Sequence, residues 1–341
     1  MSLELSQLLP ALASGRTLSE SDAERAFDWL LSGSLDDAQI AAMLSMIQTR
    51  GATADEVVGA ARVMRRNVAR VPARDGPPII DTCGTGGTPK AFNISTAAAI
   101  VAAAAARGKL RVAKHGNRSR TGRGSAEVLQ ALGVNVNATP DVQARCLDEV
   151  GACFCFAIHH HPAMKHAAAA RKSLGFPTIF NVLGPLTNPA GATRQLIGVY
   201  RPELVPLVAV ALARLGAQSA MVVHGLDGMD EITTRTNTLA ATVMNGGVMT
   251  YELSPGGLGL AAPASTNLSA ASVEDSARIV REVLAGKAGA HADIVLINAA
   301  AALVVGGVTP SLEEGVSVAR GAIASGAASR ALDELVRVSN G

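Results

Sequence analysis

Short apolar runs, each typical of a buried β-strand, alternate with Ala-rich stretches typical of helices through the middle of the chain. The runs cover residues 79–81, 110–113, 154–158, 195–200 and 220–223. This alternation is typical of a largely parallel sheet, because a crossover between parallel strands needs a connection as long as a helix. The sequence therefore predicts an α/β domain with a largely parallel central sheet.

The first part of the chain carries helix signals instead. We identify three successive helix signatures there. The clearest has apolar residues at the i, i+3, i+4, i+7 spacing of one helical face, namely Ile40, Met43, Leu44 and Ile47. Ser34 with Asp37, and Thr53 with Glu56, have capping-box spacing, and Gly51 supplies a stop signal. A helical subdomain is therefore expected to open the chain.

These patterns divide the chain into two predicted units. Residues 1–72 form a helical subdomain, and residues 73–341 form the larger α/β domain. The segment 71–78, rich in Pro and Gly, reads as the linker between them. A later helical segment near 162–188 is expected to pack on the helical subdomain.

Charge and hydropathy exclude several classes of partner. Lys and Arg number 30 against 28 Asp and Glu, a net charge of +2, so we expect no nucleic-acid and no membrane partner. The apolar stretches 97–106 and 294–308 are shorter than the roughly 18–20 residues of a membrane span and read as buried helices. The start of the chain has no secretion-signal pattern, which favours the cytoplasm. The cysteines form no CxxC pair and read as buried, reduced thiols.

The most informative segment runs from the first predicted strand through a Gly-rich turn into a helix. It contains Gly84, Thr85, Gly86, Gly87 and Thr88, and then Asn93, Ile94, Ser95 and Thr96 where the helix begins. Glycines let backbone N–H groups approach an anion, and a helix N-terminus adds to the attraction. The segment therefore indicates a phosphate site, although a Gly-rich turn with an N-cap is the plain alternative. It matches neither the dinucleotide fingerprint nor the Walker loop.

A second group of polar residues follows the next predicted strand. It comprises Lys114, His115, Gly116, Asn117, Arg118 and Ser119, with Ser125 shortly after. Ligands of open α/β sheets bind beyond the carboxyl ends of strands, so the two loops should face one crevice. Lys114 would act as a point charge on phosphate. The alternative is that Lys114 and Arg118 are solvated surface charges.

Two later segments carry further candidates. Histidines 159–161 do not form a metal site if the segment is extended, because neighbouring side chains then point to opposite faces. Arg171 has the planar fork that matches a carboxylate, against the alternative of a helix-surface salt bridge. Asp230 and Glu231 follow the strand 220–223, and adjacent carboxylates at a strand end suit Mg²⁺. A solvated turn is the alternative for that pair.

Taken together and in this order, D-x-x-G-T-G-G, N-I-S-T, K-H-G-N-R, H-P-A-M-K, N-V-L-G-P-L-T-N-P and G-M-D-E resemble the anthranilate phosphoribosyltransferase family. The resemblance covers nearly the whole chain. It implies transfer of the phosphoribosyl group from phosphoribosyl pyrophosphate to the amine of anthranilate, in tryptophan biosynthesis. It also implies an α/β domain shared with nucleoside phosphorylases and a homodimer through the helical subdomain.

The resemblance also assigns residues to roles. Those matching the phosphoribosyl pyrophosphate site are Gly84, Thr85, Gly86, Gly87, Thr88, Asn93, Ile94, Ser95, Thr96, Lys114, His115, Gly116, Asn117, Arg118, Ser119 and Ser125. Those matching the anthranilate site are Gly84, His115, Asn117, His161, Arg171 and Pro185. Ser95, Asp230 and Glu231 match ligands of a Mg²⁺ cofactor. No residue is assigned as a general base, because the neutral amine can lose its proton after attack.

Departures from the family pattern lie in the phosphate loops. Thr88 stands where the family usually has Asp, and the stretch 84–93 is one residue short, as is the stretch after Arg118. These departures leave open a different aromatic acceptor. A nucleoside phosphorylase, favoured by G-R-G at 122–124, is a second alternative. A non-catalytic nucleic-acid-binding relative is a third, against which stand the low net charge and the retained acids.

Overall fold

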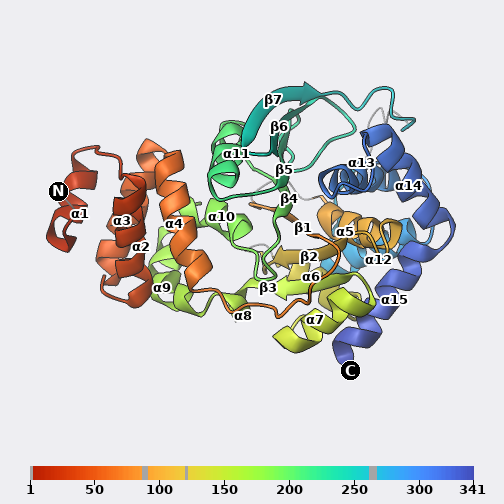
Figure 1. Cartoon of the computed structure of the whole chain (residues 1–341), viewed down its shortest axis with the longest axis horizontal. Helices are drawn as coiled ribbons and strands as arrows, with labels where there is room; N and C mark the ends of the chain where they lie inside the picture. Colours follow the sequence, from red (N-terminus) through yellow and green to blue (C-terminus); the bar gives the residue numbers. More distant parts are fainter. Residues whose placement is uncertain (1–2, 87–90, 120–121, 261–266) are drawn as a thin grey trace.

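A computed structural model describes residues 3–86, 91–119, 122–260 and 267–341. Over these residues the chain forms a seven-stranded sheet in the order β3-β2-β1-β4-β5-β6-β7, with helices on both faces and a separate helical group at the N-terminal end (Figure 1). The strands are β1 (Ile79–Gly84), β2 (Arg111–Gly116), β3 (Ala152–Phe156), β4 (Arg194–Gly198), β5 (Ser219–Gly225), β6 (Thr238–Met244) and β7 (Gly247–Leu253). Strands β1 to β5 pair in parallel, which confirms the predicted α/β class.

The antiparallel hairpin of β6 and β7 was not predicted. It pairs with β5 and closes through Asn245 and Gly246, both at positive φ. An Asn-Gly pair between two apolar runs is a strong hairpin signal, because both turn residues must adopt a left-handed conformation. The local sequence therefore contained the information, and the prediction overlooked it.

The predicted strand limits were also partly wrong. Strand β2 continues to Gly116 because its pairing with β3 extends to Phe156, so Lys114, His115 and Gly116 are strand residues, not loop residues. The same pairing ends β3 at Phe156, two residues before the predicted end, at Ile158. Strand β4 ends at Gly198, where its partner β1 ends.

The helical group begins with α1 (Leu5–Ala13), α2 (Glu20–Ser32), α3 (Asp37–Arg50) and α4 (Ala54–Arg66). Residues 3–72 thus contain one helix more than predicted. The apolar face of α3 is fully buried as expected, and Thr53 with Glu56 forms a capping box on α4. The Ser34–Asp37 pairing was wrong, because Asp36 caps α3 together with Gln39.

Later segments pack on this group. They are α9 (Lys165–Leu174), against α2 and α3, and α10 (Ile179–Leu183), against α3 and α4. The rings of Phe27 and Phe180 lie 5.6 Å apart, edge to face. Helix α11 (Leu204–Arg214) contacts α4 and the β5–β6 side of the sheet. One hydrophobic core therefore runs from the N-terminal helices to one face of the sheet.

A second core fills the other face, and adjacent strand residues alternate between the two cores, as Leu196 and Ile197 do. The covering helices are α5 (Ile94–Ala105), α6 (Ser125–Ala131), α7 (Pro140–Glu149), α12 (Val273–Leu284), α13 (Ala290–Val305), α14 (Leu312–Ala324) and α15 (Ala327–Asn340). Helices α5 and α13 are the predicted buried helices, and all the cysteines are buried free thiols, as expected. In the described ranges, no helix is long and apolar enough to cross a membrane.

Candidate functional site

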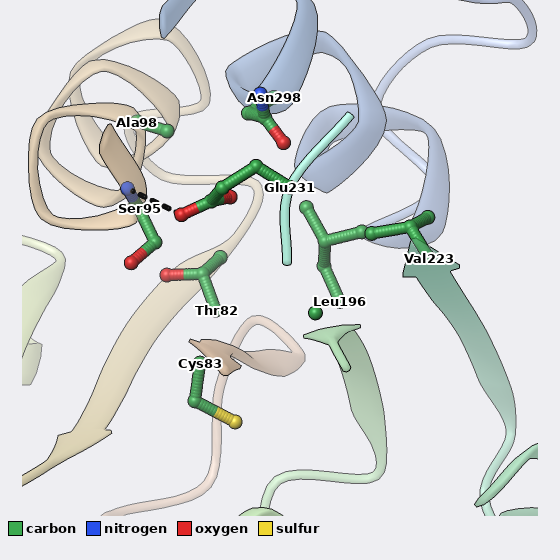
Figure 2. Close-up of a pocket in the computed structure, with 9 residues that line it drawn as sticks. Thr82, Cys83, Ser95, Ala98, Leu196, Val223, Glu231 and Asn298 are labelled. Atoms are coloured by element: carbon green, nitrogen blue, oxygen red, sulfur yellow. Dashed lines mark hydrogen bonds between the residues drawn. The ribbon is translucent and has the colours of Figure 1, made fainter. Parts of the chain in front are cut away.

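Polar side chains from several elements meet where β1 and β5 end and α5 begins. A small pocket there is lined by Thr82, Cys83, Ser95, Ala98, Leu196, Gly198, Val223, Glu231 and Asn298. Figure 2 shows Glu231 directed toward Ser95, with Asn298 reaching down from α13. The pocket lies at the carboxyl edge of the parallel strands, where ligands of open α/β sheets bind.

The glycine turn after β1 is anchored on β4. The Thr85 amide donates to the carbonyl of Gly198 at 2.9 Å, and the Thr85 hydroxyl accepts from the Tyr200 amide at 3.1 Å. Gly86 has a φ of 65°, in the left-handed region that glycine favours. The Thr85 side chain therefore helps to fix the position of the turn. Gly87 and Thr88, both predicted phosphate contacts, lie outside the described residues.

The start of α5 brings Ser95 to the centre of the site. The Ser95 amide donates to Glu231 Oε1 at 3.1 Å, and the Ser95 hydroxyl lies 3.1 Å from Lys114 Nζ. Asn93 is the N-cap residue, but its side-chain oxygen accepts from the Ser276 hydroxyl. Ile94 and Thr96, which were predicted to contact phosphoribosyl pyrophosphate, have buried side chains. Of the helix-start residues, Ser95 thus makes the direct contacts to the charged groups.

Lys114 lies in β2 with its ammonium group inside the protein. Nζ donates to the Thr82 carbonyl at 2.5 Å as well as to Ser95. Burial lowers the pKa of Lys114, and the negative charges of nearby acidic groups, Glu231 among them, oppose that shift. The alternative of a solvated surface charge is therefore wrong for this lysine.

Asp230 and Glu231 sit in the irregular stretch between β5 and β6. A Cβ added to Gly84 would lie 3.0 Å from Asp230 Oδ2, so this carboxylate faces the glycine turn. Burial, followed by the negative charge of Asp230, raises the pKa of Glu231 to about 8. Glu231 is therefore held against Ser95 in a desolvated environment, and the solvated-turn alternative does not describe it.

The donor set of this acid pair fits Mg²⁺. In the described parts of the chain there is no group of three or more His, Cys, Asp or Glu that could hold a metal. Magnesium does not need such a group, because it commonly takes one or two carboxylates and completes its shell with water and substrate phosphate. The half-buried Asp230 and Glu231, with Ser95 bonded to Glu231, have this character.

The predicted histidines separate in space. Residues 157–160 form the short helical turn α8 (Ala157–His160), so the expected extended geometry was wrong, although the side chains still diverge. His159 contacts Asn137, and His160 Nδ1 contacts the Ala69 carbonyl. His161 Nε2 lies 3.3 Å from Nε2 of His115. Burial, reinforced by the charge of neighbouring histidines, lowers the pKa of His115 to about 3 and that of His161 to about 4, so both rings are neutral.

The loop after β2 folds back against the start of α6. Asn117, Arg118 and Ser119 are exposed, and the Ser119 hydroxyl accepts from the Arg123 amide at 2.8 Å. Gly116 approaches Ser125 so closely that an added Cβ would lie 2.2 Å from the Ser125 hydroxyl oxygen. The exposed loop residues therefore stand beyond the carboxyl end of β2, beside the site.

The remaining acceptor candidates lie on the helical side. The Arg171 guanidinium, on α9, stacks over the Phe180 ring at 5.0 Å. Pro185 is buried in the short turn η2 (Gly184–Leu186), where its carbonyl accepts from Gln195 at 2.6 Å. Direct contacts therefore join Ser95, Lys114 and Glu231, whereas those described for Arg171 and Pro185 are with neighbouring structural residues.

Sequence reasoning missed Gly198 and Asn298. The backbone of Asp230 packs against Gly198, and Asn298 binds the backbone of Ile232. A lone amide within the apolar run 294–305 was a visible signal for Asn298, because a buried polar group needs a partner. No comparable signal marked Gly198, since glycine is abundant in this chain.

Two family models and several curated relatives match this chain over nearly its whole length. Residues 76–329 match the family described as "Glycosyl transferase family, a/b domain", and residues 6–68 match its helical bundle domain. The chain is 49% identical to the anthranilate phosphoribosyltransferase of Rubrobacter xylanophilus, over 98% of this chain and 97% of that one. It is 46% identical to that of Acetivibrio thermocellus, over 98% and 97% of the two chains.

Solved structures agree in fold. The anthranilate phosphoribosyltransferase of Thermus thermophilus superposes with a TM-score of 0.89 at 38% identity, covering 98% of this chain and 100% of the other. That of Saccharomyces cerevisiae, in complex with PRPP (phosphoribosyl pyrophosphate) and Mg, gives 0.87 at 28% identity, covering 98% of each chain.

Proposed function

The chain belongs to the anthranilate phosphoribosyltransferase family, and from this premise we propose that the crevice around Ser95 is where it carries out the family reaction. The enzyme transfers the phosphoribosyl group from phosphoribosyl pyrophosphate to the amine of anthranilate. The products are N-(5-phosphoribosyl)anthranilate and pyrophosphate, and the reaction belongs to tryptophan biosynthesis.

One observation carries the placement of the reaction. Ser95 contacts Glu231 through its amide and Lys114 through its hydroxyl. The N-terminus of α5, the acid pair and a buried cation therefore lie next to one another. A diphosphate with a divalent ion needs this combination of positive groups and metal ligands. Gly84 stands next to Asp230, which supports placing the glycine turn beside the pyrophosphate.

In this proposal phosphoribosyl pyrophosphate lies between the glycine turn after β1 and the end of β2 with the loop that follows it. The backbone of residues 84–86, the start of α5, and residues 114–119 with Ser125 surround its phosphates. Gly87 and Thr88 are assigned to the same site from the sequence alone. Asp230, Glu231 and the Ser95 hydroxyl hold Mg²⁺, which, when bound, supplies positive charge to the departing pyrophosphate. Lys114, which donates to the Ser95 hydroxyl, adds a fixed positive charge.

Anthranilate is placed on the side of the histidine pair. Arg171 offers its guanidinium to the carboxylate, and Asn117 offers its amide near the reacting centre. Gly84, His115, His161 and Pro185 line the path of the aromatic ring. Both histidines are neutral, so the pocket accepts an aromatic ring without adding charge beside it.

The chemical step follows from this arrangement. The amine nitrogen of anthranilate attacks C1 of the ribose with its lone pair, the bond from C1 to the pyrophosphate oxygen breaks, and the configuration at C1 inverts. The protein lowers the barrier by positioning both substrates and by stabilising the charge that develops on pyrophosphate. The nitrogen releases its extra proton to water afterwards, so no general base is required.

Two further features belong to the proposal: a homodimer through α1 to α4, and a cytoplasmic location. Light scattering of the purified chain tests the first, with a mass near twice 34.7 kDa expected. Fractionation of the source cells tests the second.

The assignment of substrate is tested by offering the chain alternative pairs. Phosphoribosyl pyrophosphate is supplied with anthranilate or with other aromatic amines and acids, and a pyrimidine nucleoside is supplied with phosphate. We expect pyrophosphate release only with anthranilate and phosphoribosyl pyrophosphate. Faster release with another acceptor, or nucleoside cleavage by phosphate, would overturn the assignment.

A further inference from the structure

The acid pair is carried by an irregular stretch of chain, and its neighbour Ile232 is bound from α13. Asn298 Oδ1 accepts from the Ile232 amide at 3.0 Å, and Asn298 Nδ2 donates to the Ile232 carbonyl at 2.9 Å. One side-chain amide thus pairs with both backbone groups of a single residue. This two-point pairing fixes the position and the orientation of the chain immediately after Glu231.

The surroundings of Asn298 make this pairing costly to lose. Asn298 is 1% exposed, Ile232 is 0% exposed, and the remainder of α13 from Ile294 to Val305 is apolar. The second hydrogen of Nδ2 bonds to the Ile294 carbonyl at 2.8 Å. Truncation of Asn298 would leave the amide and carbonyl of Ile232 without their partner in a dry interior, where they would seek new partners by moving.

We propose that Asn298 is a positioning residue that holds Asp230 and Glu231 in the arrangement required to bind Mg²⁺. The inference rests on the proposed function, because that proposal makes the acids metal ligands. Asn298, on α13, and Glu231, between β5 and β6, line the same pocket, as Figure 2 shows. Because Ile232 directly follows Glu231, a shift of Ile232 would also move the Glu231 carboxylate.

Asn298 limits the freedom of the acid segment to change its orientation. Glu231 is held at its carboxylate by the Ser95 amide and at the following residue by Asn298. Without Asn298 the chain directly after Glu231 loses both of its side-chain hydrogen bonds and can shift, so that the two carboxylates no longer face a common centre. Outer groups that orient metal ligands typically change metal affinity by roughly 10–100-fold when removed.

The test measures donor binding, not turnover. The dissociation constant of phosphoribosyl pyrophosphate is determined by calorimetry without anthranilate, once in excess Mg²⁺ and once in a chelator, for each variant. The ratio of the two constants reports how much the metal strengthens binding. Asn298→Ala removes the amide, and Asn298→Leu keeps its branched shape without a charge while losing the donors and the acceptor, which covers the case in which the alanine variant does not fold.

A matched control separates this role from stability alone. Leu303→Ala deletes a fully buried side chain from the same helix and destabilises it without removing a bond to Ile232. We expect the Mg²⁺ ratio to fall about tenfold or more in Asn298→Ala and Asn298→Leu. The constant measured in chelator should stay unchanged, and Leu303→Ala should keep the full ratio despite a lower melting temperature.

The outcomes distinguish the two proposals. Glu231→Gln must itself lower the Mg²⁺ ratio, and if it does not, the metal role of the acid pair fails regardless of Asn298. If Glu231→Gln lowers the ratio and both Asn298 variants keep it, the positioning role of Asn298 is wrong. A fall of the same size in Leu303→Ala would also overturn it, because general loosening of α13 would then explain the effect.

Discussion

The backbone carbonyl of Asp230 lies directly against Gly198, at a point where a Cβ on Gly198 would come within 1.6 Å of that oxygen. Gly198 is the last residue of β4, and its own carbonyl accepts from the Thr85 amide. One glycine therefore brings the acid segment and the glycine turn to the same edge of the sheet. Any side chain at residue 198 would push the two apart.

Gly198→Ala should consequently lose magnesium-dependent donor binding and a large part of its stability. The clash is with backbone, which cannot rotate away as a side chain can, and overpacking of this kind typically costs about 1–3 kcal/mol. Thermal unfolding and calorimetry with phosphoribosyl pyrophosphate measure the two effects. Gly321→Ala is the control: it lies exposed in α14 with no atom within 4 Å of an added Cβ, and should be neutral or stabilising by up to about 1 kcal/mol. Wild-type behaviour of Gly198→Ala would show that the close approach is unimportant.

The raised pKa of Glu231 predicts how stability depends on pH. Its pKa is about 8 in the folded protein against 4.5 for the free side chain, so the folded state holds a proton that the unfolded state has released. Ionising Glu231 in its desolvated environment therefore lowers the stability of the folded state. This loss of stability is absent below about pH 4.5, grows as the pH rises from 4.5 to 8, and is complete above about pH 8. Glu231→Gln, which has no such proton, should therefore melt higher than wild type at about pH 8.5 without metal. The two should converge near pH 5, and a constant difference across this range would contradict the assignment.

Metal binding should show the complementary trend. Mg²⁺ requires the ionised carboxylate, so binding of the donor with Mg²⁺ should release a proton below about pH 8 and strengthen as pH rises toward that value. Calorimetry in two buffers of different ionisation enthalpy measures the released proton. Identical heats in both buffers would indicate that no acid with a raised pKa takes part.

Arg171→Lys tests the acceptor side of the site. Lysine keeps the positive charge but loses the planar fork that matches a carboxylate and the stacking on Phe180. We expect the KM for anthranilate to rise about tenfold, equivalent to about 1.4 kcal/mol, with the KM for phosphoribosyl pyrophosphate unchanged. Lys172→Gln, at the exposed next position, is the control. Unchanged saturation by anthranilate in Arg171→Lys would remove this residue from the acceptor site.

Features that depend on local sequence could be predicted well. The apolar spacing of α3 and the alternation of strands and helices reflect the periodicity of side-chain burial, which a single sequence displays. The Gly84 turn and the acid pair were recognised for the same reason, because each is a short contiguous pattern. The hairpin of β6 and β7 was also locally encoded, by Asn245 and Gly246, and was overlooked.

Features that depend on contacts between distant residues could not be predicted. Nothing in the residues around Asn298 says that its amide faces Ile232, since 66 residues separate them in the chain. The buried state of Lys114 likewise depends on β2 extending further than its apolar core suggested, because its pairing with β3 prolongs it. Thr88 and its short loop, the clearest departure from the family pattern, fall outside the described residues.

We propose that the glycine turn, the buried lysine and the acid pair form one Mg²⁺-dependent site that joins anthranilate to phosphoribosyl pyrophosphate. Anthranilate fluorescence follows this directly when the purified chain is mixed with both substrates and Mg²⁺. We predict that the fluorescence decays in the complete mixture, stops decaying when a chelator is added, and decays far more slowly with Glu231→Gln. Constant fluorescence with well-folded wild-type protein, or a decay that neither the chelator nor the substitution slows, would contradict the claim.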